Sequence, residues 1–197
     1  MMKKIILASN NKNKLREMKF NFNKYGIEVI SQSEAGVNIE VEENGTTFQE
    51  NATLKAKAIF EIMKTPVISD DSGLEVDALD GKPGVYSARF CGYDSSDKDK
   101  CNKILEMMKD IEDDSKRTAR FKCAICYIDE NGEKHIFERS CEGIIAKKAQ
   151  GESGFGYDPI FLVGDKTFAE MSEDEKNKIS HRGLAIKALM EYVSSQN

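Results

Sequence analysis

The chain has 197 residues, of which 40% are hydrophobic, so it is long enough to bury a substantial core. Its formal net charge of −5 argues against a broad nucleic-acid-binding surface, because such domains usually carry a basic excess. An odd number of cysteines, an apolar start too short for a signal peptide and no stretch of membrane-spanning length favour an intracellular protein. We therefore expect one domain of residues 1–197 with reduced thiols, located in the cytoplasm.

The first third of the chain alternates strand and helix signals. Residues 5–8 predict a buried strand, and the apolar positions that follow a polar turn recur at helical spacing until Gly26. Residues 27–30 predict a second strand. After an acidic and irregular stretch, Thr47 and Glu50 match a capping box that opens the next helix.

The middle of the chain contains the most informative segment. Residues 66–70 predict a short apolar strand that ends in two adjacent carboxylates, Asp70 and Asp71. Residues 74–79 alternate apolar and acidic side chains, as an exposed strand does, and residues 96–109 predict a helix.

The last third begins with a predicted hairpin. Residues 120–128 and 135–145 read as strands joined by a turn at 130–133, residues 150–158 form a glycine-rich loop, and a closing helix starts near Ser180. These elements predict one α/β domain with a sheet of mixed direction flanked by helices, which the hairpin could divide into two lobes.

The segment from Asp70 to Ser72 is the first candidate site. Carboxylates at the C-terminal end of a strand in an α/β sheet lie where ligands bind, and oxygen ligands of this kind suit Mg²⁺. An ordinary surface turn is the competing interpretation, since Asp-Asp-Ser-Gly is also good turn chemistry. A nearby acidic cluster offers either a second metal ligand or a solvated face; it consists of Glu40, Glu42, Glu43 and Glu50.

Three lysines are candidate phosphate partners: Lys12, Lys14 and Lys55. Lysines are mostly plain surface residues, so each one is weak evidence by itself. Lys14 gains weight from its place at the start of a helix, where free N–H groups and the helix dipole favour phosphate.

The glycine-rich loop is the second strong signal, because Phe155 or Tyr157 could stack on a base. A flexible loop with an aromatic plug is the alternative. Further along, His181 and Arg182 suggest a hydrogen-bonding pair that reads a ligand edge, and two histidines in the whole chain argue against a zinc site. The Cys123-x-x-Cys126 spacing is not read as a redox or zinc motif, since positions i and i+3 of a strand face opposite sides.

Taken together, four parts of the chain resemble the inosine triphosphate pyrophosphatase family in the right order over nearly the whole length. These parts are residues 9–14, residues 47–52, residues 69–79 with 83–89, and residues 154–161 followed by 180–182. One departure is visible in the first loop, which usually reads Thr-Gly-Asn and here reads Ser9-Asn10-Asn11. Serine keeps the hydroxyl, and asparagine tolerates left-handed backbone better than most residues.

The resemblance implies a two-lobed fold around a central nucleotide cleft, a homodimer, and Mg²⁺-dependent hydrolysis of ITP, dITP and XTP to the monophosphate and pyrophosphate. It implies that Asp71 accepts a proton and meets the metal, and that Glu43 is the other metal-linked carboxylate. The substrate-binding positions that it implies are Ser9, Asn10, Asn11, Lys12, Asn13, Lys14, Ser72, Phe155, Gly156, Tyr157, Asp158, Lys176, His181 and Arg182. Lys55 joins them as a phosphate partner chosen from its position in the sequence.

Two other functions compete with this one. A septum-inhibitor-like pyrophosphatase shares the broad fold and acts on other nucleotides, but the Ser-His-Arg and Phe-Gly-Tyr-Asp segments argue against it. A non-catalytic nucleotide- or RNA-binding module is the second alternative, and the acidic net charge argues against RNA. We expect no stable nucleic-acid partner and no membrane association.

Overall fold

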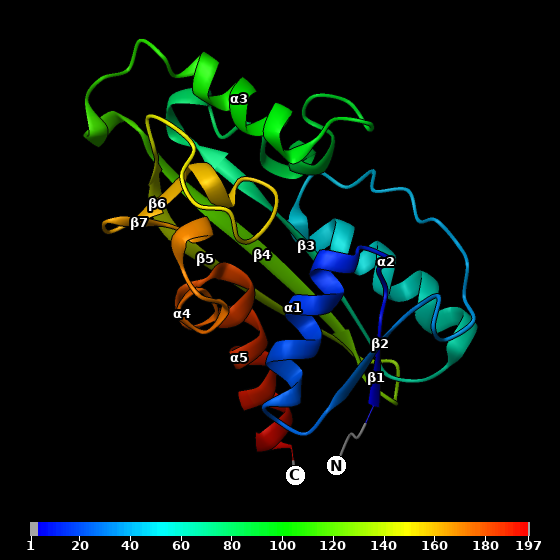
Figure 1. Cartoon of the computed structure of the whole chain (residues 1–197). Coiled ribbons are helices and arrows are strands. Elements are labelled where there is room, and N and C mark those ends of the chain that lie inside the picture. Colours follow the sequence, from blue (N-terminus) through cyan, green and yellow to red (C-terminus); the bar gives the residue numbers. More distant parts are fainter. Residues whose placement is uncertain (1–3, 197) are drawn as a thin grey trace. The chain divides into compact units, whose positions relative to one another are not determined.

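The structure is a computed structural model that describes residues 4–196 (Figure 1). Its helices and strands, in chain order, are β1 (Lys4–Leu7), α1 (Lys12–Asn23), β2 (Glu28–Ser31), α2 (Phe48–Met63), β3 (Val67–Val76), α3 (Asp97–Met107), β4 (Thr118–Ile128), β5 (Lys134–Ile145), β6 (Phe161–Val163), β7 (Lys166–Thr167), α4 (Glu173–Ile179) and α5 (His181–Ser195). Short 3-10 turns connect several of them. Within the described residues, no helix is long and apolar enough to cross a membrane.

The seven strands form one sheet in the order β2-β1-β3-β4-β5-β6-β7. Strand β1 pairs in parallel with β2 and with β3, whereas β6 pairs antiparallel with β5 and with β7. The predicted α/β class with a sheet of mixed direction is therefore confirmed. The contacts divide the described chain into two compact units, and the boundary crosses β3, β4, β5 and the start of α5 rather than a linker.

The first unit contains residues 4–71, 123–139 and 182–196. Side chains alternate along β1, as the period of a strand requires. Ile5 and Leu7 enter one apolar cluster with residues of α1 and α5, and Ile6 and Ala8 enter a second cluster with residues of α2. Helices therefore cover both faces of this part of the sheet, and burial on both faces explains why β1 is apolar throughout.

The second unit contains residues 72–122 and 140–181 and has one apolar cluster of its own. Leu74 and Val76 from β3, Ile104 from α3, and Phe161 and Phe168 beyond the hairpin are all fully buried in it. The predicted helix at 96–109 is thus confirmed as α3, whose buried residues face this cluster.

The predicted end of the strand at the two carboxylates is wrong. Strand β3 continues through Asp70 and Asp71 to Val76, and residues 74–79 are not a separate exposed strand. Its parallel neighbour β1 pairs only with Val67 and Ile68, yet β4 lies on the other side of β3 in the sheet. The carboxylates therefore lie beyond the end of β1 but inside β3.

Capping signals place helix α2 and also reveal a helix that the sequence reading missed. Thr47 caps α2 by accepting from the Glu50 N–H, and the Glu50 carboxylate closes the predicted capping box. The same motif opens the seven-residue helix α4, where Ser172 and Glu175 form the reciprocal pair. Seven residues are too few to show a helical period, so the capping box is the one sequence signal that could have predicted this helix.

Candidate active site

The neighbouring carboxylates of β3 have different surroundings, because successive side chains of a strand point to opposite faces. Asp70 is fully buried, and its Oδ2 accepts from Arg182 Nη2 at 3.0 Å and Nε at 3.2 Å, while Lys14 Nζ lies 3.1 Å away. Burial alone would raise the pKa of Asp70, but Lys14, Arg182 and Lys55 hold it well below its ordinary value. Asp70 is therefore a permanent anion that fixes two cations.

Asp71 is also buried, and its contacts come from helix α2 and the acidic stretch before that helix. Asn51 Nδ2 donates to Asp71 Oδ2 at 3.1 Å, and Lys55 Nζ lies 3.5 Å from Asp71 Oδ1. The same ammonium group donates to Glu43 Oε1 at 2.5 Å. Burial raises the pKa of Asp71, against the opposing effect of Lys55 and Lys14. A carboxylate with a raised pKa is suited to accept a proton near neutral pH.

Helix α2 brings these groups together because Asn51 and Lys55 are one turn apart and share a face. Asn51 also accepts from the Gly45 N–H at 2.8 Å, which ties the irregular stretch carrying Glu43 to the helix. A Cβ at Gly45 would lie 2.7 Å from Asn51 Oδ1, so glycine is needed for this approach. Asn51 and Gly45 were not singled out from the sequence, although both lie beside the recognised capping box.

Glu43 and Asp71 fit the chemistry of a Mg²⁺ site, since both offer carboxylate oxygens to one shared cation, Lys55. Glu50 is used by the α2 cap and is thereby removed from the acidic candidates. Glu40 and Glu42 are exposed. The structure therefore selects Glu43 from the cluster of four glutamates as the acid that converges with Asp71.

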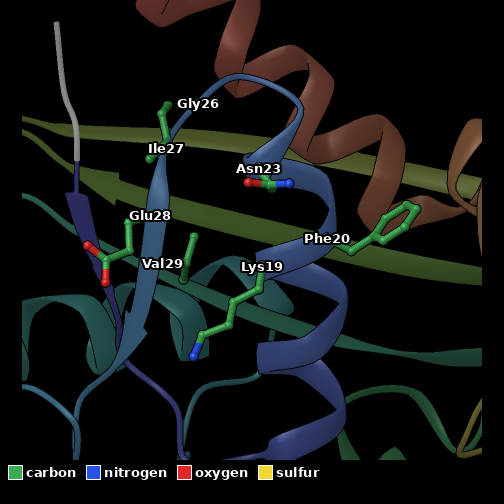
Figure 2. A pocket seen from close by; sticks show the side chains of 7 residues that line it. All are labelled: Lys19, Phe20, Asn23, Gly26, Ile27, Glu28 and Val29. Atoms are coloured by element: carbon green, nitrogen blue, oxygen red, sulfur yellow. The ribbon is translucent and has the colours of Figure 1, made fainter.

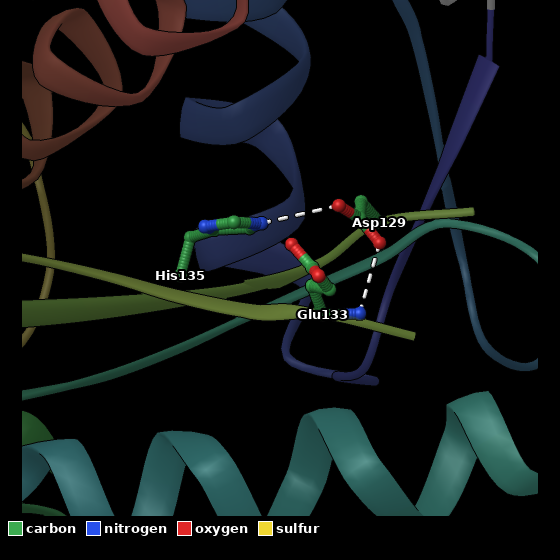
Figure 3. Close-up of side chains that lie close together, drawn as sticks. All are labelled: Asp129, Glu133 and His135. Atoms are coloured by element: carbon green, nitrogen blue, oxygen red, sulfur yellow. Dashed lines mark hydrogen bonds and ion pairs between the residues drawn. The ribbon is translucent and has the colours of Figure 1, made fainter. Parts of the chain in front are cut away.

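A different group of metal-type ligands lies at the β4–β5 turn, where Asp129, Glu133 and His135 come close together (Figure 3). Asp129 Oδ1 accepts from the backbone N–H groups of Asn131 and Glu133, each at 2.9 Å, and Asp129 Oδ2 lies 3.2 Å from His135 Nε2. These bonds are those of a tight turn that stabilises the hairpin.

The loop from Ser9 to Lys14 forms the start of helix α1. Asn11 is the N-cap and accepts from the N–H groups of Asn13 and Lys14, while Ser9 Oγ accepts from the Asn11 N–H. Asn10 and Lys12 are exposed beside it. A capped helix start with lysines is a suitable place for a phosphate.

In the second unit, Asp158 fixes the glycine-rich loop from inside. Its Oδ2 accepts from the Phe155 N–H at 2.9 Å and from Lys176 Nζ at 2.7 Å. A Cβ at Gly154 would lie 2.0 Å from this carboxylate, and Gly154 has a φ of +79°, so only glycine fits. The Lys176 ammonium also lies 5.2 Å from the centroid of the Phe155 ring. Three of the predicted nucleotide positions, Phe155, Asp158 and Lys176, thus meet at this buried ion pair.

The structure distinguishes the two aromatic residues of this loop. Tyr157 is 3% exposed and its hydroxyl donates to the Ser87 carbonyl at 2.9 Å, so its ring belongs to the apolar cluster. Phe155 is only partly buried. Of the two residues that could stack on a base, the structure therefore favours Phe155.

His181 and Arg182 have separate partners. The His181 ring stacks on Phe121 with centroids 4.7 Å apart and an interplanar angle of 13°. Arg182 is 2% exposed, and its guanidinium also donates from Nη1 to Glu17. That the two residues read a ligand edge stays a prediction. Glu17 was missed, because nothing in its surface-like helical position distinguishes it.

The first unit also contains a surface hollow and a pair of buried cysteines. A hollow between α1 and β2 is lined by Lys19, Phe20, Asn23 and residues 26–29, and no predicted site residue lines it (Figure 2). Cys123 and Cys126 are buried in opposite clusters, and burial raises their pKa values to about 12 and about 11. The rejection of a redox or zinc motif at these cysteines agrees with this separation.

The Ham1 family model matches residues 5–192. The dITP/XTP pyrophosphatase of Clostridium perfringens is 46% identical over 196 residues, covering 95% of this chain and 96% of that protein. The protein of the same name from Bacillus subtilis is 47% identical, with 95% and 96% covered. The solved structure of the Staphylococcus aureus Ham1 protein has a TM-score of 0.87 and 42% identity, covering 99% of this chain and all of that one. The chain therefore belongs to the Ham1 family.

Proposed function

We propose that this protein hydrolyses non-standard purine nucleoside triphosphates, namely ITP, dITP and XTP, to the monophosphate and pyrophosphate. Two relatives that match over almost their whole length are named dITP/XTP pyrophosphatases. The structural observation that carries the proposal is the buried carboxylate of Asp71, which has a raised pKa and shares Lys55 with Glu43. This is an arrangement for activating water beside a polyanion.

In this proposal Asp71 accepts the proton of a water that attacks the α-phosphorus. The bond from that phosphorus to the bridging oxygen breaks, and pyrophosphate leaves with the electron pair. Lys14, Lys12 and the N–H groups at the start of α1 bind phosphate oxygens, with Ser9, Asn10, Asn11, Asn13 and Ser72 as further contacts. Lys55 neutralises charge beside the reacting phosphate.

Glu43 and Asp71 would hold the metal, for which we propose Mg²⁺, and it would neutralise polyphosphate charge. Removal of divalent metal with EDTA should abolish turnover, and added Mg²⁺ should restore it. Glu43→Gln should raise the Mg²⁺ concentration needed for half-maximal rate. Glu42→Gln, at an exposed neighbouring position, is the matched control and should leave that concentration unchanged.

Base recognition is assigned to the second unit. Phe155 offers its ring for stacking, the Gly156 backbone and Tyr157 shape the loop, and the Asp158–Lys176 ion pair supplies fixed polar groups. His181 is a further proposed base contact. A site built to hydrogen-bond a 6-oxo purine rejects a 6-amino purine strongly, because the wrong edge leaves buried polar groups unpaired.

The test is a panel of nucleoside triphosphates with Mg²⁺, assayed for pyrophosphate release. We expect release from ITP, dITP and XTP and little from ATP or GTP. Preference for a pyrimidine or modified nucleotide would favour the septum-inhibitor-like alternative. Binding without release would favour a non-catalytic nucleotide-binding module.

Asp71→Asn tests the catalytic assignment directly. The amide cannot accept a proton from water, so turnover should fall at least about 100-fold while the melting temperature changes little. Asp110→Asn removes the same charge at an exposed position and should keep full activity. Substantial turnover by the Asp71 variant would remove this residue from the mechanism.

We also propose, from the family resemblance, a cytoplasmic homodimer that binds no nucleic acid stably. Light scattering should give twice the mass of the chain. If the mass in solution equals that of a single chain, the dimer is rejected, and the proposed hydrolysis is unaffected.

A further inference from the structure

Helix α3 binds the backbone of Gly156 through both its N–H and its carbonyl. The Gly156 N–H donates to Asp97 Oδ2 at 2.6 Å, and the Cys101 thiol donates to the Gly156 carbonyl at 3.3 Å. Asp97 and Cys101 are four residues apart, so they share one face of α3, one turn from each other. The helix therefore presents an acceptor and a donor to the same glycine.

These contacts do not arise from helix capping. Ser96 is the N-cap of α3, and Asp99 completes the capping box, so the helix start needs nothing from Asp97. The Asp97 side chain is 46% exposed and its other oxygen pairs with Lys100 at 3.0 Å. Because Asp97 is half exposed, its carboxylate loses little hydration, and one of its oxygens accepts a hydrogen bond from a loop 59 residues away.

Gly156 follows Phe155 directly and has a φ of +63°. A Cβ at Gly156 would meet nothing within 4 Å, so space does not require glycine there, but the left-handed backbone favours it. Glycine backbone is otherwise free to rotate, so anchoring Gly156 restricts the positions that the neighbouring Phe155 ring can take. On the N-terminal side of Phe155, the Phe155 N–H donates to the Asp158 carboxylate.

We propose that Asp97 is a positioning residue, which holds the Gly156 N–H so that Phe155 is set in place for the base before substrate arrives. Cys101 supports it from the next turn. The inference rests on the proposed function for its kinetic consequence, but the anchoring itself can be measured without any nucleotide.

The test compares Asp97→Ala with Asp97→Asn, whose amide oxygen can still accept from Gly156. Asp94→Ala is the matched control, because it removes the same charge from an exposed position three residues earlier. Hydrogen exchange of the ligand-free protein should show a Gly156 amide at least about tenfold faster in Asp97→Ala, and near wild-type rates in the other two.

Kinetics with XTP should show a KM raised about fivefold to tenfold in Asp97→Ala with kcat largely retained, since binding is lost equally before and during the reaction. The melting temperature should stay within a few degrees of wild type. An unchanged Gly156 exchange rate in Asp97→Ala would overturn the proposal, and so would faster exchange with an unchanged KM. If the wild-type protein hydrolyses none of the triphosphates, the proposed function fails, and the exchange rates still decide whether Asp97 anchors the loop.

Discussion

The guanidinium of Arg182 is shared between two buried carboxylates. Asp70 takes Nε and Nη2, and Glu17 takes Nη1. Asp70 in turn holds Lys14 at 3.1 Å, so one arginine of α5 fixes the residue next to Asp71 and a lysine at the start of α1. We infer that Arg182 acts by positioning these groups rather than by contacting the base.

Replacing Arg182 should therefore lower the stability of the fold more than it weakens binding of the base. Arg182→Met leaves Asp70 and Glu17 buried with less compensation, which should lower the free energy of unfolding by about 3 kcal/mol. Arg182→Lys should recover only part of it, because an ammonium cannot bond both carboxylates in the fork geometry. Urea unfolding measures both values.

A matched control lies on the same helix. Lys187 pairs with Glu191 at 3.9 Å, and both side chains are about two-thirds exposed, so Lys187→Met should cost less than about 0.5 kcal/mol. If Arg182→Met keeps full stability and only raises KM for XTP, then Arg182 reads the base and the positioning role is wrong.

At the scale of elements, helix α2 delivers Asn51 and Lys55 to Asp71 from its first two turns, so its cap supports the site. Thr47→Ala removes the hydroxyl that accepts from the Glu50 N–H, and should lower the free energy of unfolding by about 1 kcal/mol. Thr47→Ser keeps a hydroxyl and should retain the wild-type free energy of unfolding.

Thr65→Ala is the control for this prediction, since Thr65 is exposed just beyond the helix and should change stability by less than about 0.5 kcal/mol. Chemical denaturation of the three variants supplies the comparison. Equal stability of wild type and Thr47→Ala would show that tertiary packing alone fixes the helix start.

Helix α2 and its neighbours show which parts of the fold could be predicted from the sequence. Thr47 and Glu50 predicted its start because a cap is a local device, readable from residues three apart. Asp71 was singled out from a wrong element boundary, since alternation cannot show that Leu74 and Val76 are buried in the continuation of β3. Three-residue β6 and two-residue β7 are too short to carry a period, and they were missed.

Long-range pairing is the part that local patterns could not supply. Glu17 of α1, Asp70 of β3 and Arg182 of α5 are separated by up to 165 residues in the chain. Glu17 stands in an ordinary surface-like helical sequence, and nothing local to Asp70 or Arg182 identifies the partner of either residue. Resemblance placed Arg182 among the functional residues, but its partners, and hence its role, came only from the folded arrangement.

At the scale of the whole molecule, four of the five cysteines lie in the apolar clusters, and each cluster contains at least one of them. Cys123 and Cys126 lie in the two clusters of the first unit, and Cys101 and Cys141 lie in the cluster of the second. All four are buried, and burial raises their pKa values to about 11 or 12. Cys91 is the exposed thiol.

Alkylation with iodoacetamide at pH 7.5 should therefore modify one thiol quickly in the native protein and five in concentrated guanidinium, counted by intact mass. The thiolate is the reactive form, and a buried thiol with a raised pKa supplies almost none of it. Cys91→Ser should abolish the fast reaction while leaving four thiols to react after unfolding. Rapid modification of a second cysteine in the native protein would mean that the cluster containing it opens readily, and peptide mapping would identify which of the two units is the less stable.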